Sequence, residues 1–473
     1  MGNASPPSIS DLRKLVNIIS NSVDKIEEGY TAHAAPLPTL ATTEPTLSSV
    51  AFEPDVLKAT AALTAACTQL QHTVQPQTTQ IFHCATGHFL SSSMSVAIQA
   101  HVTEALRSAG DKGLHVRDIA KYSNVHPEKL ARCLRMLATH YIFREVAPDV
   151  FANNRLSVQL DTGKDAELLR TQEPHEWFEG TNGRAAICYY ITGFQYDVAG
   201  KLPETILDPA TADSSSITDA AVTRVTGEKR GMFEWLMQPE QTKYRSVFNN
   251  AMVGVEMYNF PGFVLHDEIG WETLPKGSVV VDVAGGVGTH SLIVARAHPH
   301  LRVVVEDLPA TIDQAKAYWN LHLPEAVSDG RVDFTEYDFF QPNPIKGAAV
   351  YFCRQTIHNW PDKEAIQILR QMSDAADAHS RIVITGHVIL FACPEAKSSE
   401  WSVPPAPEPL LANYGAASRT AYVTDMIMMG TFHSGQRTGE QYAGLIRQAG
   451  LKIDKIVGDY ENGGLLHILC SKA

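Results

Sequence analysis

The clearest chemical signal in the chain is a glycine-rich turn within residues 279–291, VVVDVAGGVGTHS. An apolar run ends at Val283, and Gly285 and Gly286 then allow a ligand to approach main-chain atoms without interference from a Cβ atom. Asp282 lies just before the turn, where a carboxylate can meet a cationic or amino-bearing ligand. The chain has no GKS or GKT sequence to hold a triphosphate, so ATP and GTP are disfavoured.

Acidic residues also end the next two strands that the pattern predicts. Asp307 closes the apolar run VVVED, at the position where an acid usually binds the two hydroxyls of a ribose. Asp338 and Phe339 follow in the sequence EYDFF, where a carboxylate and a ring could hold an adenine amino group and cover its ring. The alternative for this pair is a strand-end acid beside core phenylalanines.

The run YFCRQTIHNWPD at 351–362 delivers Arg354 and His358 to the same edge of the predicted sheet. Ligands bind at the carboxyl ends of the strands in open α/β folds. A neutral imidazole accepts a proton near neutral pH, so His358 is a candidate general base. A structural histidine is the alternative, since the chain has 19 of them.

The elements that position these residues belong to an α/β domain. Buried apolar runs at 279–283, 303–307, 348–352 and 381–385 alternate with stretches of helical length, which predicts a doubly wound parallel, Rossmann-like sheet. We assign residues 246–473 to this cofactor-binding catalytic domain. The prolines of residues 401–411 predict a surface insertion within it.

The first half of the chain is mostly helical. Residues 1–75 form a helical extension with a proline-rich linker, and residues 76–245 form a helical domain. Within that domain, residues 113–146 predict helix, turn, helix and strand, which together make a winged helix. A winged helix binds DNA or serves packing and dimerisation, and the chain has 39 basic against 52 acidic residues, which opposes nucleic-acid binding.

Composition excludes other classes. The seven cysteines are widely spaced and form no metal-ligand pattern, so we expect no metal site and reduced thiols. No stretch approaches the roughly 20 apolar residues of a membrane span. We therefore expect a cytoplasmic protein that has no membrane partner.

Five segments resemble a known family in order and spacing: DVAGGVG, VEDLP, EYDFFQP, RQTIHNWPD and DMIMMGTFHSGQRTGEQYAGLIRQAGL. They are similar to the cation-independent class I S-adenosylmethionine-dependent O-methyltransferases, in the branch of plant phenylpropanoid and fungal polyketide-tailoring enzymes. The resemblance spans roughly residues 80–473. In this family the winged helix is a dimerisation module, so the resemblance implies a homodimer.

The resemblance also implies the cofactor, S-adenosyl-L-methionine, and a role for each matching residue. The glycine turn would lie against the methionine portion, Asp307 would hold the ribose, and His358 would deprotonate a substrate hydroxyl. The full set implied for cofactor binding is Asp282, Gly285, Gly286, Asp307, Asp338, Phe339 and Arg354.

Three positions depart from the family pattern. Ala284 replaces the first of three glycines, which is a minor change if its φ is negative. Gly386 and Gln436 stand where the family usually has acidic residues that flank the histidine. A carboxylate would fix the tautomer of the imidazole and stabilise the imidazolium, whereas Gln436 supplies a hydrogen bond but no charge. We therefore expect a weaker base.

These departures leave two reactions open. The first is O-methylation of a hydrophobic, polyketide-like small molecule, with His358 as general base. The second is a pericyclase or cyclase reaction on the same fold, in which the sulfonium is retained as a fixed positive charge and no methyl is transferred. In either case Met426, Met429 and Gln436 are expected to line the substrate pocket, with packing in the core as the alternative for the methionines.

Overall fold

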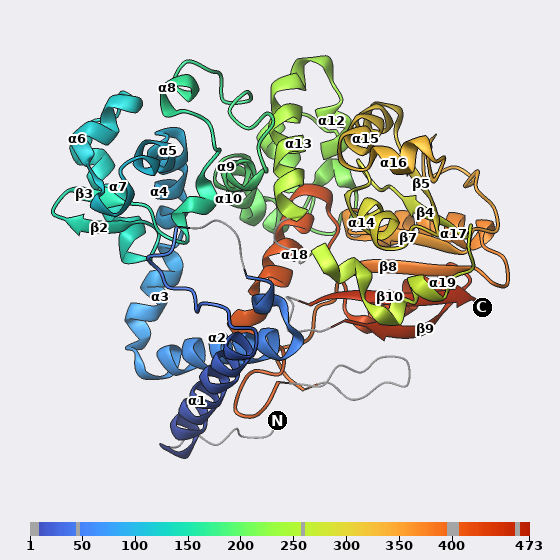
Figure 1. Cartoon of the computed structure of the whole chain (residues 1–473), viewed down its shortest axis with the longest axis horizontal. Helices are drawn as coiled ribbons and strands as arrows, with labels where there is room; N and C mark the ends of the chain where they lie inside the picture. Colours follow the sequence, from blue (N-terminus) through green and yellow to red (C-terminus); the bar gives the residue numbers. More distant parts are fainter. Residues whose placement is uncertain (1–8, 44–47, 257–260, 395–405, 459–463) are drawn as a thin grey trace.

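The computed structural model describes residues 9–43, 48–256, 261–394, 406–458 and 464–473. Figure 1 shows a winged-helix unit and a large sheet at opposite ends of the molecule, with helices between them. The helices of the first half of the chain are α1 (Ile9–Ala32), α2 (Pro54–Val74), α3 (Gln77–Ala85), α4 (His88–Gln99), α5 (Val102–Arg107), α6 (Val116–Ile119), α7 (Pro127–Thr139), α8 (Ala166–Leu169), α9 (Arg184–Thr192), α10 (Phe194–Leu207), α11 (Ala221–Thr226), α12 (Met232–Leu236) and α13 (Thr242–Glu256).

The N-terminal extension packs on the C-terminal domain. Leu15 of α1 and Ala66 of α2 are buried in one cluster with Leu410. The small alanine side chains of α2 permit this close approach, and Gln69 Nε2 donates to the carbonyl of Pro409 at 2.7 Å. In the described part of 401–411, Ala406 and Leu410 are covered by this packing, whereas Pro407, Glu408 and Leu411 are exposed. The segment is thus a surface loop that is anchored at two residues, and residues 401–405 lie outside the described residues.

The winged helix is present between residues 114 and 152. Helices α6 and α7 are joined to a small sheet of order β1-β3-β2, with β1 at Leu114–His115, β2 at Arg144–Ala147 and β3 at Val150–Ala152. The predicted strand at 142–146 begins two residues late because Phe143 has φ +69°, outside the extended region. Arg135 on α7 forms ion pairs with Glu145 and Asp149, so a basic residue of the second helix is already neutralised.

The C-terminal domain is built on a seven-stranded sheet of order β6-β5-β4-β7-β8-β10-β9. Its strands are β4 (Val279–Val283), β5 (Arg302–Asp307), β6 (Val332–Glu336), β7 (Val350–Arg354), β8 (Arg381–His387), β9 (Leu451–Val457) and β10 (Leu465–Lys472). Strands β4 to β8 pair in parallel as predicted, whereas β10 is antiparallel to both of its neighbours. The sheet is thus mixed at one edge and Rossmann-like elsewhere.

Helices cover both faces of this sheet, which explains its continuous apolar strands. They are α14 (Thr289–Ala297), α15 (Pro309–His322), α16 (Pro324–Ser328), α17 (Asp362–Ala375) and α19 (Gly439–Gln448). Helix α18 (Arg419–Phe432) packs instead on the helical domain, where Met428 and Phe432 are buried. Val281 packs in a cluster with α17 and α19, while Val303 packs in a cluster with α14 and α15. The chain leaves β4 toward β5 and later returns to β7 on its other side, so the strand order reverses at β4. Ligands bind at such a switch point.

Candidate active site

The glycine turn connects β4 to α14 and is shaped by close contacts. Gly285 N donates to Glu306 O at 3.1 Å, and a Cβ at residue 285 would lie 2.5 Å from the Asp282 carboxylate. Gly286 has φ +61°, and a Cβ there would point into open space. The turn therefore needs glycine at residue 285 for room and at residue 286 for conformation, and it leaves main-chain atoms open to a ligand.

Ala284 does not have the negative φ under which its replacement of glycine would be minor. Its φ is +57°, in the left-handed region. An L-residue held there loses roughly 1 kcal/mol or more relative to its favoured conformations. The substitution therefore stores strain in the loop.

Asp307 closes the turn from the neighbouring strand. Its Oδ2 accepts from Gly286 N and its Oδ1 from Leu308 N, both at 2.8 Å. Burial raises the pKa of this carboxyl, while the two main-chain hydrogen bonds oppose the shift. Each carboxylate oxygen retains a lone pair, so the arrangement fits the hydroxyls of a ribose.

The segment after β6 carries the pair that we expected at adenine. Asp338 is exposed, and its Oδ1 accepts from Phe340 N at 3.0 Å. Phe339 is half-buried, with its ring centroid 5.7 Å from that of Trp360. Trp360 lies two residues after His358, so an aromatic contact joins the expected adenine position to the histidine turn.

Glu306 is a buried acid that the sequence argument missed, although an acid within the apolar run VVVED was a visible signal. Its side chain is fully buried, and Asn343 Nδ2 donates to Oε2 at 2.7 Å. Asn343 Oδ1 accepts from Ile345 N at 2.9 Å. Glu306 therefore ties the segment after Asp338 to the strand that ends in Asp307. Burial, reinforced by the charge of Asp282, raises the pKa of Glu306 to about 8.

This pKa predicts a pH dependence of stability. The folded state keeps Glu306 protonated above its ordinary pKa of 4.5, so it holds more protons than the unfolded chain. The free energy of unfolding should then fall by about 1.4 kcal/mol per pH unit from roughly pH 5 to pH 8, and level off above. Glu306→Gln should flatten this dependence in urea unfolding at several pH values. The exposed Glu336→Gln is the control, and an unaltered slope in Glu306→Gln would contradict the assignment.

His358 lies in a short turn, η10 (Ile357–Asn359), directly beyond β7. The imidazole is buried, with the residue 7% exposed. Ser434 Oγ donates to His358 O at 2.6 Å, and Arg437 donates to the carbonyls of Ile357 at 3.1 Å and Trp360 at 2.7 Å. The turn is thus fixed by side chains from the segment between α18 and α19. Sequence reasoning did not single out Arg437, although it directly follows Gln436 in the segment GQRT that resembles the family.

Gln436 meets the imidazole directly. Its Nε2 lies 2.7 Å from His358 Nδ1, and its main-chain N donates to Asp425 Oδ1 at 2.7 Å. A Cβ at Gly435 would lie 2.6 Å from the same Asp425 oxygen, so a side chain there would displace the Asp425 carboxylate. Asp425 is a second residue that the sequence argument missed; it positions Gln436 through the backbone.

Residue 386 is the other position at which the family usually has an acid, and the structure leaves no room for a side chain there. A Cβ at Gly386 would lie 2.8 Å from the hydroxyl of Tyr442, a buried residue of α19. A phenol therefore occupies the space that an acidic side chain would need.

Arg354 lies on β7, and the two methionines that we expected to line the substrate pocket lie on α18. Arg354 ends β7, opposite Thr385 of β8, and its charge acts on both His358 and His290. Met429 of α18 is partly buried, whereas Met426 is 45% exposed and faces solvent in the single chain. A pocket-lining role for both methionines stays a prediction, and the exposure of Met426 gives it no support.

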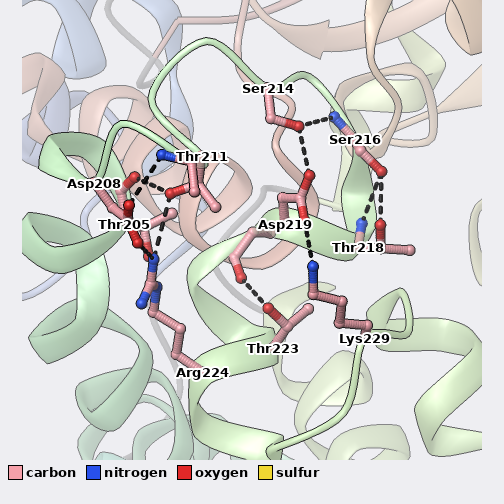
Figure 2. Close-up of polar contacts among 12 residues, drawn as sticks. Thr205, Asp208, Thr211, Ser214, Ser216, Thr218, Asp219, Thr223, Arg224 and Lys229 are labelled. Carbon is pink, nitrogen blue, oxygen red and sulfur yellow. Dashed lines mark hydrogen bonds and ion pairs between the residues drawn. The ribbon is translucent and has the colours of Figure 1, made fainter.

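Figure 2 shows the polar contacts within a loop of the helical domain, between residues 205 and 229. Arg224 Nη2 donates to Asp208 Oδ2 at 2.7 Å, and Ser214 Oγ donates to Asp219 Oδ2 at 2.8 Å. From this loop, Ser216 O accepts from His433 Nδ1 at 2.8 Å. His433 directly precedes the residues that contact His358, so the loop is attached to the turn that positions the imidazole.

Comparison with known proteins assigns the family. Residues 224–402 match the model of an O-methyltransferase domain, and residues 82–162 match that of an O-methyltransferase dimerisation domain. The chain is 33% identical to 4-O-methyltransferase 1 of Phanerochaete chrysosporium, over 96% of this chain and 97% of that one. It is 34% identical to an O-methyltransferase of Armillaria gallica, with 95% and 96% covered. A solved structure described as a pericyclic reaction enzyme shares the fold, with a TM-score of 0.66 at 19% identity, covering 88% of this chain and 94% of that one.

The chain therefore belongs to the S-adenosylmethionine-dependent O-methyltransferases, and its cofactor is S-adenosyl-L-methionine. The open glycine turn, the Asp307 carboxylate and the segment at Asp338 fit a nucleoside that also carries an amino acid. When bound, this cofactor supplies an electrophilic methyl group on a positively charged sulfur. Among the residues that the structure describes, no group of His, Cys, Asp and Glu could hold a metal ion. No helix in the described ranges is long and apolar enough to cross a membrane.

Proposed function

We propose that this enzyme methylates a hydroxyl group of a hydrophobic, polyketide-like small molecule of secondary metabolism. The observation that carries the proposal is the buried His358, at the carboxyl edge of the sheet, with Nδ1 on Gln436. This contact leaves Nε2 as the ring atom that faces the acceptor. Two fungal O-methyltransferases of matching length support the reaction class.

In this proposal His358 Nε2 takes the proton of an acceptor hydroxyl that binds in its neutral form. An imidazole accepts at Nε2 only when Nδ1 carries the hydrogen, so the Gln436 amide must turn and present Oε1 to Nδ1–H. That turn also gives a donor to Oε1, which is buried and without a hydrogen bond among the described residues. Alignment of the oxygen and removal of one proton are then the tasks left to the protein.

Incubation with cofactor labelled in its methyl group tests the reaction. We expect label in the product and release of the demethylated cofactor in equal amount. Mass spectrometry of small molecules that co-purify with the protein would identify the acceptor.

A cyclase or pericyclase reaction is the second candidate, and the replacement of both flanking acids by Gly386 and Gln436 favours it. Such a reaction needs the positive charge of the cofactor and no proton acceptor of high basicity. A product that forms without label and without demethylated cofactor would establish this alternative and exclude methyl transfer.

We also propose that the enzyme is a homodimer. Helix α3 has no buried residue in the single chain, and Ile81 and Phe82 are 71% and 65% exposed. Phe82 is the first residue of the matched dimerisation domain and Ile81 directly precedes it, and exposed apolar patches of this kind mark interfaces. Light scattering should give a dimer for the wild type and a monomer for the double variant Ile81→Glu, Phe82→Glu. Leu321→Glu, at a comparably exposed residue of α15, should stay dimeric; a dimer in all three would place the interface elsewhere.

A further inference from the structure

Neither of the two positions at which the family usually has an acid beside the histidine, residues 386 and 436, supplies an acid here. Gln436 lies on Nδ1, and the Tyr442 hydroxyl occupies the space beside Gly386. A carboxylate stabilises the imidazolium that forms when a histidine accepts a proton, whereas an amide orients the ring and brings no charge. The geometry therefore positions His358 well and leaves it weakly basic.

The charged and titratable groups around the ring do not replace the missing acid. They come from four parts of the fold: Arg354 of β7, His387 of β8, Arg437 before α19, and Asp425 of α18. The Asp425 oxygen is engaged by the main chain of Gln436, and Arg437 pairs with Asp362 of α17 at 2.8 Å. Burial, followed by the charges of His387, Arg437 and Arg354, lowers the pKa of His358 to about 3.

On the basis of the proposed methyl transfer, we propose that this enzyme selects acceptors whose hydroxyl is acidic enough to reach His358 already ionised. Phenols and enols conjugated to a carbonyl group are the chemical class that meets this condition. The acceptor oxyanion forms a bond to the methyl carbon, the bond from that carbon to sulfur breaks with its electron pair left on sulfur, and no proton moves. A phenol of ordinary pKa, about 10, would require a stronger base than this site provides.

A series of para-substituted phenols of similar size tests the selection. The probes are 4-ethylphenol, 4-hydroxyacetophenone and 4-nitrophenol, in order of increasing acidity. At pH 7 we expect kcat/KM for labelled methyl transfer to rise at least tenfold along the series. For each acceptor the rate should increase with pH along the ionisation of that acceptor. Equal or falling values of kcat/KM would overturn the selection.

Binding of 4-nitrophenol gives a readout that does not depend on methyl transfer. Its phenolate absorbs visible light, so the ionisation state of the bound ligand is observable in the enzyme that holds demethylated cofactor. We expect the bound form to be the phenolate at pH values where the free compound is mostly neutral. A bound neutral phenol would overturn the proposal.

Gln436→Glu restores the missing charge. It should raise transfer to 4-ethylphenol about tenfold or more and weaken binding of the nitrophenolate to a similar degree, since proton acceptance by a positioned base contributes 10²–10⁴-fold. Gln441→Glu is the matched control: it adds the same charge on the exposed first turn of α19, where glutamate also completes the capping box with Thr438. If Gln436→Glu transfers methyl to 4-ethylphenol and binds the nitrophenolate as the wild type does, the uncharged amide is not what sets the selection of acceptors.

The outcomes separate this inference from the proposed function. Labelled methyl on 4-ethylphenol as readily as on 4-nitrophenol defeats the inference and leaves methyl transfer established. Binding of 4-nitrophenol as an anion without any labelled product defeats methyl transfer and retains the anion-selective site. If Gln436→Glu does not fold, the acidity series and the absorbance titration of the wild type still decide the question.

Discussion

Replacement of His358 by alanine is expected to reduce methyl transfer to a protonated acceptor by about 10²-fold, the lower end of the contribution of a positioned general base, because the site leaves this imidazole weakly basic. The effect should appear at a pH below the pKa of the acceptor hydroxyl, where a proton has to be removed. It should shrink at higher pH, because an ionised oxygen needs no base. Incorporation of labelled methyl, measured from below to above the pKa of the acceptor, checks both the size of the loss and its decrease at high pH.

Binding of the cofactor should survive the same substitution. His358 lies in the turn after β7, whereas the glycine turn follows β4. Calorimetry should therefore give a cofactor Kd within a few-fold of the wild-type value. His379→Ala, at an exposed histidine before β8, is the control for activity. A large loss of cofactor affinity in His358→Ala would show that the imidazole belongs to the cofactor site.

Asp307→Ala is expected to weaken cofactor binding by about 1–3 kcal/mol, or roughly 5- to 150-fold in Kd, the scale of a lost charge-assisted hydrogen bond. Two effects add here. The variant loses the carboxylate that we place at the ribose, and Gly286 N loses the acceptor that fixes the glycine turn. Isothermal titration with the demethylated cofactor measures the change without turnover.

A neighbouring acid provides the control for this experiment. Asp333, on β6, forms an exposed ion pair with Arg302 at 2.9 Å. Asp333→Ala should leave cofactor affinity unchanged, since exposed pairs contribute little and this one contacts no part of the site. Equal affinities for wild type and Asp307→Ala would show that the ribose lies elsewhere.

The fold and the residues at the carboxyl edge of the sheet were predictable because their signals are local. Strands buried on both faces are apolar throughout, and the carboxyl ends of parallel strands meet at one edge. Asp282, the glycines and Asp307 could therefore be placed together from their positions at strand ends. The antiparallel direction of β10 could not be predicted, because the residues of a strand do not indicate whether it pairs in parallel or antiparallel with its neighbours.

The sequence by itself determined which residues stand at the carboxyl edge of the sheet and that the family's acids are missing at the two positions expected to flank the histidine. Only the tertiary structure decided what replaces them. The contact between Gln436 and His358 joins residues 78 positions apart, and it depends on how the segment after α18 packs on the turn after β7. The same holds for the raised pKa of Glu306 and the positive φ of Ala284, because burial and backbone strain are properties of the packed chain.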